Sequence, residues 1–265
     1  DLRTAQRHCT TARMKTAPLL AATALALFAP ASFAQTKAPD PARLMTTVEK
    51  LVSFGTRHTL SSATDPKRGI GAARKWGAAE FEKISKGCGG CLKVEMVEDR
   101  FTGPRAPDGV NVVDVLAIQR GTGDPNQVVI VAGHIDSRVS DVMDITSDAP
   151  GANDDGSGTA LVIEAARVLA GEKFDGTIVY ALLSGEEQGL WGGKLLAATA
   201  KARGWQVRAM LNNDIVGNTL GQNGSIVDQR VRVFSEGARS AEDIKAAMTR
   251  RGIGGEDDSP SRALA

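Results

Sequence analysis

The sequence has 265 residues, of which 42% are hydrophobic, and it carries 32 Lys+Arg against 31 Asp+Glu. A formal net charge of +1 gives no basis for charge-driven binding to nucleic acid or to a membrane surface. One Tyr and three Trp also offer too few aromatic rings for a base-stacking platform. The length and composition instead suit one soluble α/β domain with a sizeable core.

Residues 1–34 are predicted to lie outside the folded domain. Within them, Met14–Ala34 begins with a Lys after the Met, continues as an uncharged Ala/Leu-rich stretch and ends in small residues. This is the pattern of a secretory signal peptide. The apolar part is short and contains Pro18 and Pro30, which disfavours a transmembrane helix. We therefore expect a domain over 35–265 that is periplasmic or secreted, without a membrane attachment after cleavage.

The first predicted elements of this domain are two helices and two strands. Apolar residues at helical spacing predict helices over 42–54 and 70–84, and a polar loop with Arg57 lies between them. Runs of β-branched residues predict strands over 92–97 and 110–119. We expect these strands to form an antiparallel start to the sheet.

Two cysteines, Cys88 and Cys91, lie between the second helix and the first strand. In an oxidising compartment, cysteines this close together form a local disulfide. The alternative is a thioredoxin-like redox pair, although the usual context of a strand followed by a helix is missing.

Three further apolar runs predict strands over 128–132, 177–183 and 207–211. The first reads as a strand buried on both faces, and Gly133 is expected to end it. The segments between and after these strands have helical patterns, at 161–170, 190–202 and 241–250. Alternating strands and helices indicate an α/β fold with a mixed, mostly parallel central sheet flanked by helices.

Polar residues follow each of these three strands, and two more precede the helix over 161–170. In an open α/β sheet, ligands bind in the crevice beyond the carboxyl ends of the strands, so we expect these side chains to lie near one another. They are His134, Asp136, Asp154, Asp155, Glu186, Glu187 and Asp214.

One imidazole and several carboxylates form a typical metal-site composition. Both ligand types suit zinc, and an unfilled coordination position would make the site catalytic. Cysteine is absent from the set, which argues against a closed structural zinc site. Asp155 has two interpretations, as the cap of the helix that begins near Ser157 or as a support of the site. Trp191, just after the Glu pair, either packs in the core or contacts substrate.

Four motifs in this region resemble, in sequence and in order, those of the zinc exopeptidases of metallopeptidase family 28. They are Gly-His-Ile-Asp-Ser at 133–137, Pro-Gly-Ala-Asn-Asp-Asp-Gly-Ser-Gly at 150–158, Ser-Gly-Glu-Glu-Gln-Gly-Leu-Trp-Gly at 184–192 and Asn-Asp-Ile-Val-Gly at 213–217. The resemblance runs from about Leu51 to about Gly237. It implies the family's zinc exopeptidase, phosphorylase/hydrolase-like fold, with the C-terminal part missing from the sequence.

The resemblance also implies a ligand set for two zinc ions that share one bridging carboxylate. Asp154 matches the bridging position. One ion would take His134, Asp154 and Asp214. The other would take Asp154 and Glu187 together with a histidine from later in the chain.

Two further carboxylates match catalytic positions of the family. Glu186 matches the general base that takes a proton from the attacking water. Asp136 matches the carboxylate that orients the imidazole of His134. The stretch around Arg57 and His58 also resembles the family, although no role is carried over to it.

The sequence departs from the family pattern at the last metal ligand. No His follows Asp214, so the fifth ligand is expected beyond Ala265. His58 is the other candidate in the mature domain, but it lies far upstream in a loop.

The function implied by the resemblance is that of a secreted di-zinc metallo-exopeptidase acting on peptide substrates, first of all an aminopeptidase. The alternatives on the same scaffold are a carboxypeptidase, a dipeptidase and a mono-zinc enzyme similar to glutaminyl cyclases. An alternative from a different class is a degenerate domain that binds without catalysis.

Overall fold

A computed structural model describes residues 38–221, 223–234, 243, 245–246 and 248–249. The predicted signal peptide lies outside the described residues, and so does half of the predicted helix over 241–250. Among the described helices, none has the length and apolar character that crossing a membrane requires.

The described strands form one five-stranded mixed sheet in the order β1-β2-β4-β3-β5. β1 (Lys93–Gly103) and β2 (Ala106–Gln119) form an antiparallel hairpin, and β2 is also antiparallel to β4 (Thr177–Leu183). β3 (Gln127–His134) runs parallel to both β4 and β5 (Gln206–Asn212). This arrangement confirms the predicted parallel sheet with an antiparallel start.

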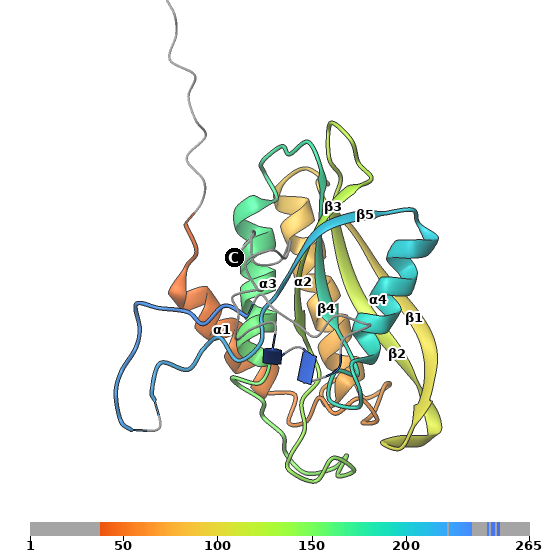
Figure 1. The fold of residues 1–265 in the computed structure, drawn as a ribbon, viewed down its shortest axis with the longest axis vertical. Coiled ribbons are helices and arrows are strands. Elements are labelled where there is room, and N and C mark those ends of the chain that lie inside the picture. The colour runs from red at the N-terminus through yellow and green to blue at the C-terminus, as the bar shows by residue number, and fades with distance from the viewer. Residues whose placement is uncertain (1–37, 222, 235–242, 244, 247, 250–265) are drawn as a thin grey trace, which may run out of the picture. The chain divides into compact units, whose positions relative to one another are not determined.

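Helices cover both faces of the sheet (Figure 1). α2 (Ile70–Gly87) and α3 (Gly156–Leu169) pack on one face, and α1 (Pro41–Val52) packs on α3. α4 (Trp191–Ala202) packs on the other face, against β1, β2 and β4. The flanking helices are thus those that the periodicity predicts, with bounds shifted by a few residues.

β3 and β4 are the most buried strands, and neither lies at an edge of the five-stranded sheet. Six of the eight β3 positions and six of the seven β4 positions are buried, and the remaining positions are half-buried. β5 differs from them, since Val207, Met210 and Leu211 expose apolar side chains. In the described part of the chain, β5 pairs with β3 alone.

The expectation that Gly133 ends the first of these strands is wrong, because β3 continues through Gly133 and His134. The glycine has a packing role instead. A Cβ added to Gly133 would lie 2.8 Å from the carbonyl carbon of Gly158, so a larger residue would push α3 away from the sheet. The pattern therefore marked a close approach between a strand and a helix, and not a strand end.

The β1–β2 hairpin is longer than the apolar runs predict. β1 continues past Val97 through the charged residues Glu98, Asp99 and Arg100, which pair with β2 and face solvent. The structure supports the packing interpretation of Trp191, because this side chain is buried and stacks on Phe101 with ring centroids 5.7 Å apart.

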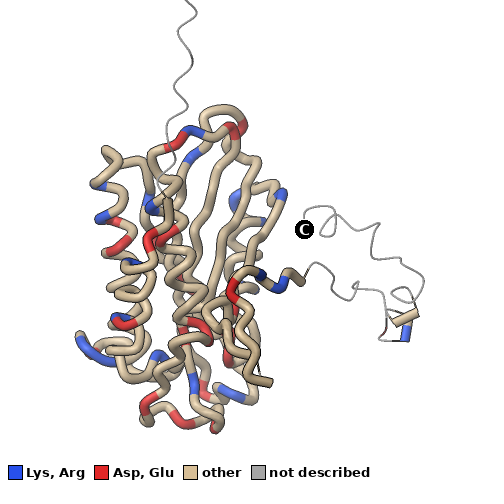
Figure 2. Tube along the Cα trace, turned by 90° about the vertical axis from the view of Figure 1, so that its left-hand side faces the viewer, with Lys and Arg blue, Asp and Glu red and all other residues tan. Residues whose placement is uncertain are grey.

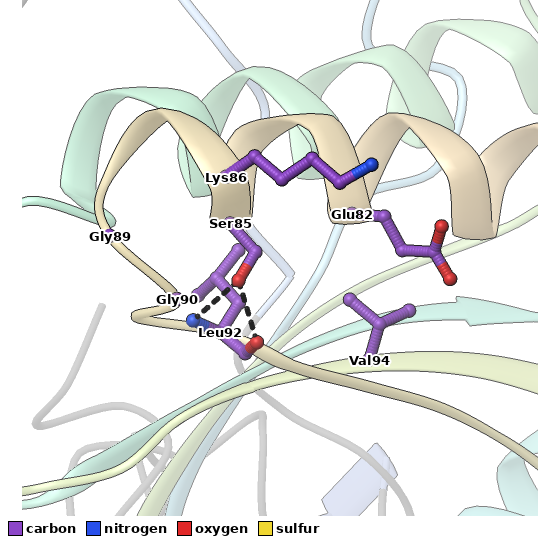
Figure 3. Close-up of a pocket in the computed structure, with 7 residues that line it drawn as sticks. All are labelled: Glu82, Ser85, Lys86, Gly89, Gly90, Leu92 and Val94. Atoms are coloured by element: carbon purple, nitrogen blue, oxygen red, sulfur yellow. Dashed lines mark hydrogen bonds between the residues drawn. The ribbon is translucent and has the colours of Figure 1, made fainter.

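Cys88 and Cys91 form a disulfide just after the end of α2. The cysteines lie at the C-terminal end of a helix, whereas redox-active cysteines are activated at helix N-termini. Next to this turn, the Ser85 hydroxyl donates to the Leu92 carbonyl and accepts from the Leu92 N–H (Figure 3). The structure therefore supports the local disulfide, which fastens α2 to the start of β1.

Glu164 on α3 fastens α1 to the rest of the domain. Its buried carboxylate accepts hydrogen bonds from the backbone N–H of Asp40, at 2.9 Å, and from the Arg43 guanidinium, at 2.7 Å. Arg167, one turn along α3, donates to the same carboxylate at 3.2 Å.

Candidate metal centre

Three of the predicted site residues come together beyond the carboxyl ends of the strands. His134, Asp154 and Asp214 each place one ligand atom within 4.8 Å of the others. They come from the end of β3, from the loop before α3 and from the chain after β5. The green loop after β3 lies at the lower end of the view in Figure 1, and Figure 2 shows acidic and basic positions side by side among the loops at this end.

The imidazole of His134 is the centre of this group. Its Nε2 lies 3.1 Å from Oδ1 of Asp154 and 3.8 Å from Oδ1 of Asp214. Its Nδ1 lies 3.1 Å from the carbonyl oxygen of Asp136 and 3.5 Å from Oδ1 of the same residue. The Nε2 edge of the ring therefore faces the two carboxylates, while the Nδ1 edge is held by Asp136.

Asp155 determines where Asp154 lies, because it has both of the roles that the sequence left open. Its Oδ1 accepts the N–H of Gly158 at 2.9 Å and caps α3, and its Oδ2 accepts the N–H of His134 at 3.0 Å. Its side chain is buried. Burial raises the pKa of the Asp155 carboxyl to about 7, against the opposing effects of His134 and of the two N–H donors. One side chain thus fixes the end of β3 and the start of α3.

Gly158 lets the segment after β5 reach the site. A Cβ at this position would lie 2.1 Å from the carbonyl oxygen of Asn213, which is closer than any side chain tolerates. Only glycine allows the backbone before Asp214 to pass directly over the first turn of α3. This contact brings Asp214 next to Asp154, although the two are far apart in sequence.

Asp136 connects His134 to the loop after β4. The carboxylate is completely buried, and it accepts the N–H of Glu187 at 3.2 Å, the N–H of Glu186 at 3.3 Å and the hydroxyl of Thr59 at 2.9 Å. Burial opposes the charge, but the contacts with His134, Thr59 and the backbone outweigh it and lower the pKa of the Asp136 carboxyl. Asp136 is therefore an ionised anchor between two parts of the site.

Glu187 lies outside the group of three. Its carboxylate pairs with Arg138, whose Nε lies 2.5 Å from Oε2. Burial raises the pKa of the Glu187 carboxyl, and the nearby Asp154 adds to this effect while Arg138 opposes it. Burial also raises the pKa of Glu186, which is half-buried. Of the four predicted ligands, the structure thus brings together His134, Asp154 and Asp214.

The group of three fits a zinc ion. Burial opposes a charge on His134, but hydrogen bonds to Asp136, Asp154 and Asp214 outweigh it and raise the pKa of the imidazole above its usual value. A cation is therefore favoured among these carboxylates, and one imidazole with two carboxylates is a ligand set that zinc takes. The carboxylates of Asp154 and Asp214 are 50% and 40% exposed, so one side of the group opens to solvent.

His58, the other candidate ligand, does not take part. It is buried, its Nε2 lies 3.0 Å from the carbonyl oxygen of Val142, and its Nδ1 accepts the N–H of Leu60 at 3.1 Å. Sequence reasoning missed Thr59 and Arg138, which touch Asp136 and Glu187. For Thr59, the only indication in the sequence was the polar stretch that contains it. Nothing in the sequence distinguished Arg138 from any other arginine in a loop.

The profile of the family described as "Peptidase family M28" matches residues 111–253 of the sequence, which is more than half of the chain. The chain belongs to peptidase family M28. A "Probable zinc metalloprotease" of Pyricularia oryzae is 47% identical to this M28 chain over 232 residues, which cover 85% of this chain and 45% of the relative. One of Leptosphaeria maculans is 48% identical over 221 residues, covering 82% and 51%. The chain spans about half the length of the curated relatives it matches.

Solved structures support the fold of this M28 chain. LapB from Legionella pneumophila has a TM-score of 0.57 at 22% identity, with 69% of this chain and 45% of LapB covered. A glutaminyl cyclase from Fimbriiglobus ruber has a TM-score of 0.54 at 22% identity, with 68% and 63% covered. The expected zinc exopeptidase fold is confirmed by these likenesses.

Proposed function

We propose that this member of family M28 is a zinc-dependent exopeptidase, and specifically an aminopeptidase that removes terminal residues from peptides. The observation that carries the proposal is the convergence of His134, Asp154 and Asp214 at the strand ends, with one side open to solvent. The family and the zinc metalloprotease relatives support the same chemistry.

His134, Asp154 and Asp214 would hold one zinc ion. A second ion would share Asp154 and would take Glu187, with an imidazole that the described residues do not supply. When bound, zinc polarises a carbonyl group and lowers the pKa of a coordinated water. Asp136 would keep the imidazole of His134 in the orientation for binding, because its carboxylate and its carbonyl oxygen both lie near Nδ1.

Glu186 would act as the general base. Its backbone N–H is held by Asp136, so the same carboxylate that orients His134 also fixes the start of the Glu186 side chain. Glu186 would accept a proton from the water that attacks the terminal peptide bond and would pass it to the leaving amine. The half-buried setting of this carboxyl favours proton exchange, because it weakens the hydration of the charged form.

We further propose that the enzyme acts outside the cytoplasm on peptide substrates. The pattern of Met14–Ala34 supports export, and the disulfide between Cys88 and Cys91 is of a kind that persists in oxidising compartments.

The test is the Glu186→Ala substitution in the full-length protein. We expect hydrolysis of an unblocked leucyl peptide to fall by at least about a hundredfold, while the zinc content stays at the wild-type value. Glu49→Ala, which removes an exposed carboxylate on α1, is the control and should change neither quantity. Undiminished hydrolysis by Glu186→Ala would reject the assigned base, and a wild-type protein without zinc or hydrolysis would indicate a binding domain.

One observation supports a second candidate, a mono-zinc enzyme similar to glutaminyl cyclases. The described residues form a single group of three ligands, while Glu187 pairs with Arg138. One tightly held zinc and cyclisation of N-terminal glutamine would favour this candidate. Two zinc ions and release of free amino acids from unblocked peptides would favour the aminopeptidase, and a preference for amino-blocked peptides would favour a carboxypeptidase.

A further inference from the structure

A buried segment between α1 and α2, Thr56–Thr59, contacts Asp136 and Ser137 next to the site. Arg57 has the largest side chain of the segment, and this side chain is buried. All of the hydrogen bonds that this side chain donates end on backbone carbonyl groups. They belong to Leu51, Ile135, Pro150 and Gly151, at 2.8 to 3.1 Å.

These contacts fasten the segment to the strand end that carries His134. The backbone N–H of Arg57 donates to the hydroxyl of Ser137 at 3.1 Å, and the N–H of Ser137 donates back to the carbonyl of Arg57 at 3.4 Å. Since Ile135 and Ser137 flank Asp136, the position of the segment relative to Asp136 is fixed from both sides.

Thr59 completes this arrangement with a single side-chain contact. Its hydroxyl donates to Oδ2 of Asp136 at 2.9 Å, which is the shortest hydrogen bond that this carboxylate accepts. The same oxygen accepts the N–H of Glu187, while Oδ1 faces the N–H of Glu186 and the ring of His134. Thr59 is buried, so water has no access to replace its hydroxyl.

We propose that Thr59 is a positioning residue, whose hydroxyl holds the Asp136 carboxylate in the one orientation that serves His134 and the Glu186–Glu187 backbone together. The inference rests on the proposed zinc site. A carboxylate can rotate about its Cβ–Cγ bond, and a donor fixed to Oδ2 removes that freedom. Without the Thr59 hydroxyl, Oδ1 could turn away from the imidazole, and the backbone of Glu186 and Glu187 would lose a fixed hydrogen-bond acceptor.

Loss of the Thr59 hydroxyl should lower the affinity for zinc, because a metal ligand binds best when the groups around it hold it in the right orientation. Replacing such an orienting partner weakens metal binding by roughly 10- to 100-fold. Thr59 acts one step further out, through Asp136, so we expect about a tenfold loss of zinc affinity. The fold itself should be less affected, because the Arg57 contacts that hold the segment do not involve the Thr59 hydroxyl.

The experiment compares Thr59→Val, which keeps the shape and removes the hydroxyl, with Thr59→Ser, which keeps the hydroxyl. Zinc affinity is measured by competition with a chelator. The values of kcat and KM are measured with leucine p-nitroanilide as substrate, and the unfolding temperature is measured in the presence of chelator. Thr177→Val is the matched control, because Thr177 is also a buried threonine that donates one hydrogen bond, to Pro125, at the opposite end of the sheet.

We expect Thr59→Val to lose about tenfold in zinc affinity and a comparable factor in kcat, with KM nearly unchanged and Thr59→Ser close to wild type. Thr177→Val should leave zinc affinity unchanged. A double-mutant cycle with Asp136→Asn tests the route, because Thr59→Val should add no further loss of zinc affinity once Asp136 is altered.

Wild-type zinc affinity and kcat in Thr59→Val would overturn the proposal, as would a Thr59→Ser variant as weak as Thr59→Val or losses that add fully in the cycle. If Thr59→Val does not fold, a comparison of Thr59→Ala with Thr59→Ser tests the same loss of the hydroxyl with a smaller side chain. These failures differ from a failure of the proposed function, in which the wild-type protein itself would bind no zinc.

Discussion

The guanidinium of Arg138 lies against the carboxylate of Glu187, with Nε 2.5 Å from Oε2. Arg138 also donates to the carbonyl oxygen of its neighbour Val139 at 3.2 Å, so its side chain folds back over the loop after β3. The residue that matches the second zinc ligand of the family is therefore engaged by an internal cation. A metal ion at Glu187 has to compete with this arginine.

Replacing Arg138 should strengthen zinc binding at Glu187. Arg138→Gln removes the competing charge, and since the ion pair is partly exposed we expect a gain of about 1 kcal/mol, roughly fivefold in the affinity of the weaker zinc. Calorimetric zinc titration measures this. Arg105→Gln is the control, because Arg105 donates to the backbone carbonyl of Glu187 and leaves its carboxylate free. Weaker zinc binding in Arg138→Gln would show that the arginine orients Glu187 instead.

The neighbours Asp154 and Asp155 should separate zinc binding from stability. Asp154→Ala removes a half-exposed carboxylate that we propose as a zinc ligand, so the variant should lose tight zinc binding and keep nearly the wild-type stability in chelator. Asp155→Ala removes the cap of α3 and the acceptor for His134 in the interior, and should cost roughly 2 to 4 kcal/mol in unfolding free energy. Urea unfolding in chelator distinguishes them. Equal destabilisation by both variants would contradict the assigned roles.

The sequence predicted most of the fold and the convergence of His134, Asp154 and Asp214, because both depend on local patterns. The apolar run at 177–183 predicts a strand whose bounds are those of β4. The motifs lie at the ends of parallel strands, and this placement brings His134 and Asp214 together. Long-range contacts were beyond such patterns. Gly133 looked like a strand end because the sequence does not show what it packs against. In the structure it packs closely against Gly158, which lies on a helix 25 residues later.

The same limit applies to the polar groups around the site. Thr59 reaches Asp136 over a separation of 77 residues, and Arg138 reaches Glu187 over 49. Neither contact leaves a periodic signal in the sequence, since each depends on how two loops pack in space. The fold and the convergence of His134, Asp154 and Asp214 were therefore predictable, whereas the contacts of Thr59 and Arg138 with the neighbouring carboxylates required the structure.

The attachment of α1 through Glu164 should depend on pH. Burial opposes the charge, but Arg43, the N–H of Asp40 and Arg167 outweigh it and hold the pKa of Glu164 below its usual 4.5. A carboxyl with a lowered folded-state pKa contributes stability that is complete above its unfolded pKa and is lost as the pH falls through its folded pKa.

Glu164→Gln should therefore destabilise the protein at neutral pH by about 1.5 to 3 kcal/mol, the usual contribution of hydrogen bonds to a charged group. The difference from wild type should shrink as the pH falls below about 4, where the wild-type carboxyl also becomes protonated. Urea midpoints of both proteins across this range measure the effect, with the exposed Glu49→Gln as control. A difference that is independent of pH would show that the charge of Glu164 is not responsible.

Removal of zinc should lower the unfolding temperature. A ligand that binds the folded state alone stabilises it by about 2.7 kcal/mol when its free concentration is a hundred times Kd. Zinc added to chelator-treated wild-type protein should therefore raise the unfolding temperature, and His134→Asn should remove this response. An equal rise in His134→Asn would place the stabilising zinc elsewhere.

The most direct test of the central claim is anomalous scattering at the zinc absorption edge from a crystal of the protein grown with zinc. We predict a strong anomalous peak at coordination distance from Nε2 of His134 and from the carboxylates of Asp154 and Asp214, with any second peak between Asp154 and Glu187. No peak at these residues, or zinc bound only at other positions of the molecule, would contradict the proposed centre and the exopeptidase function built on it.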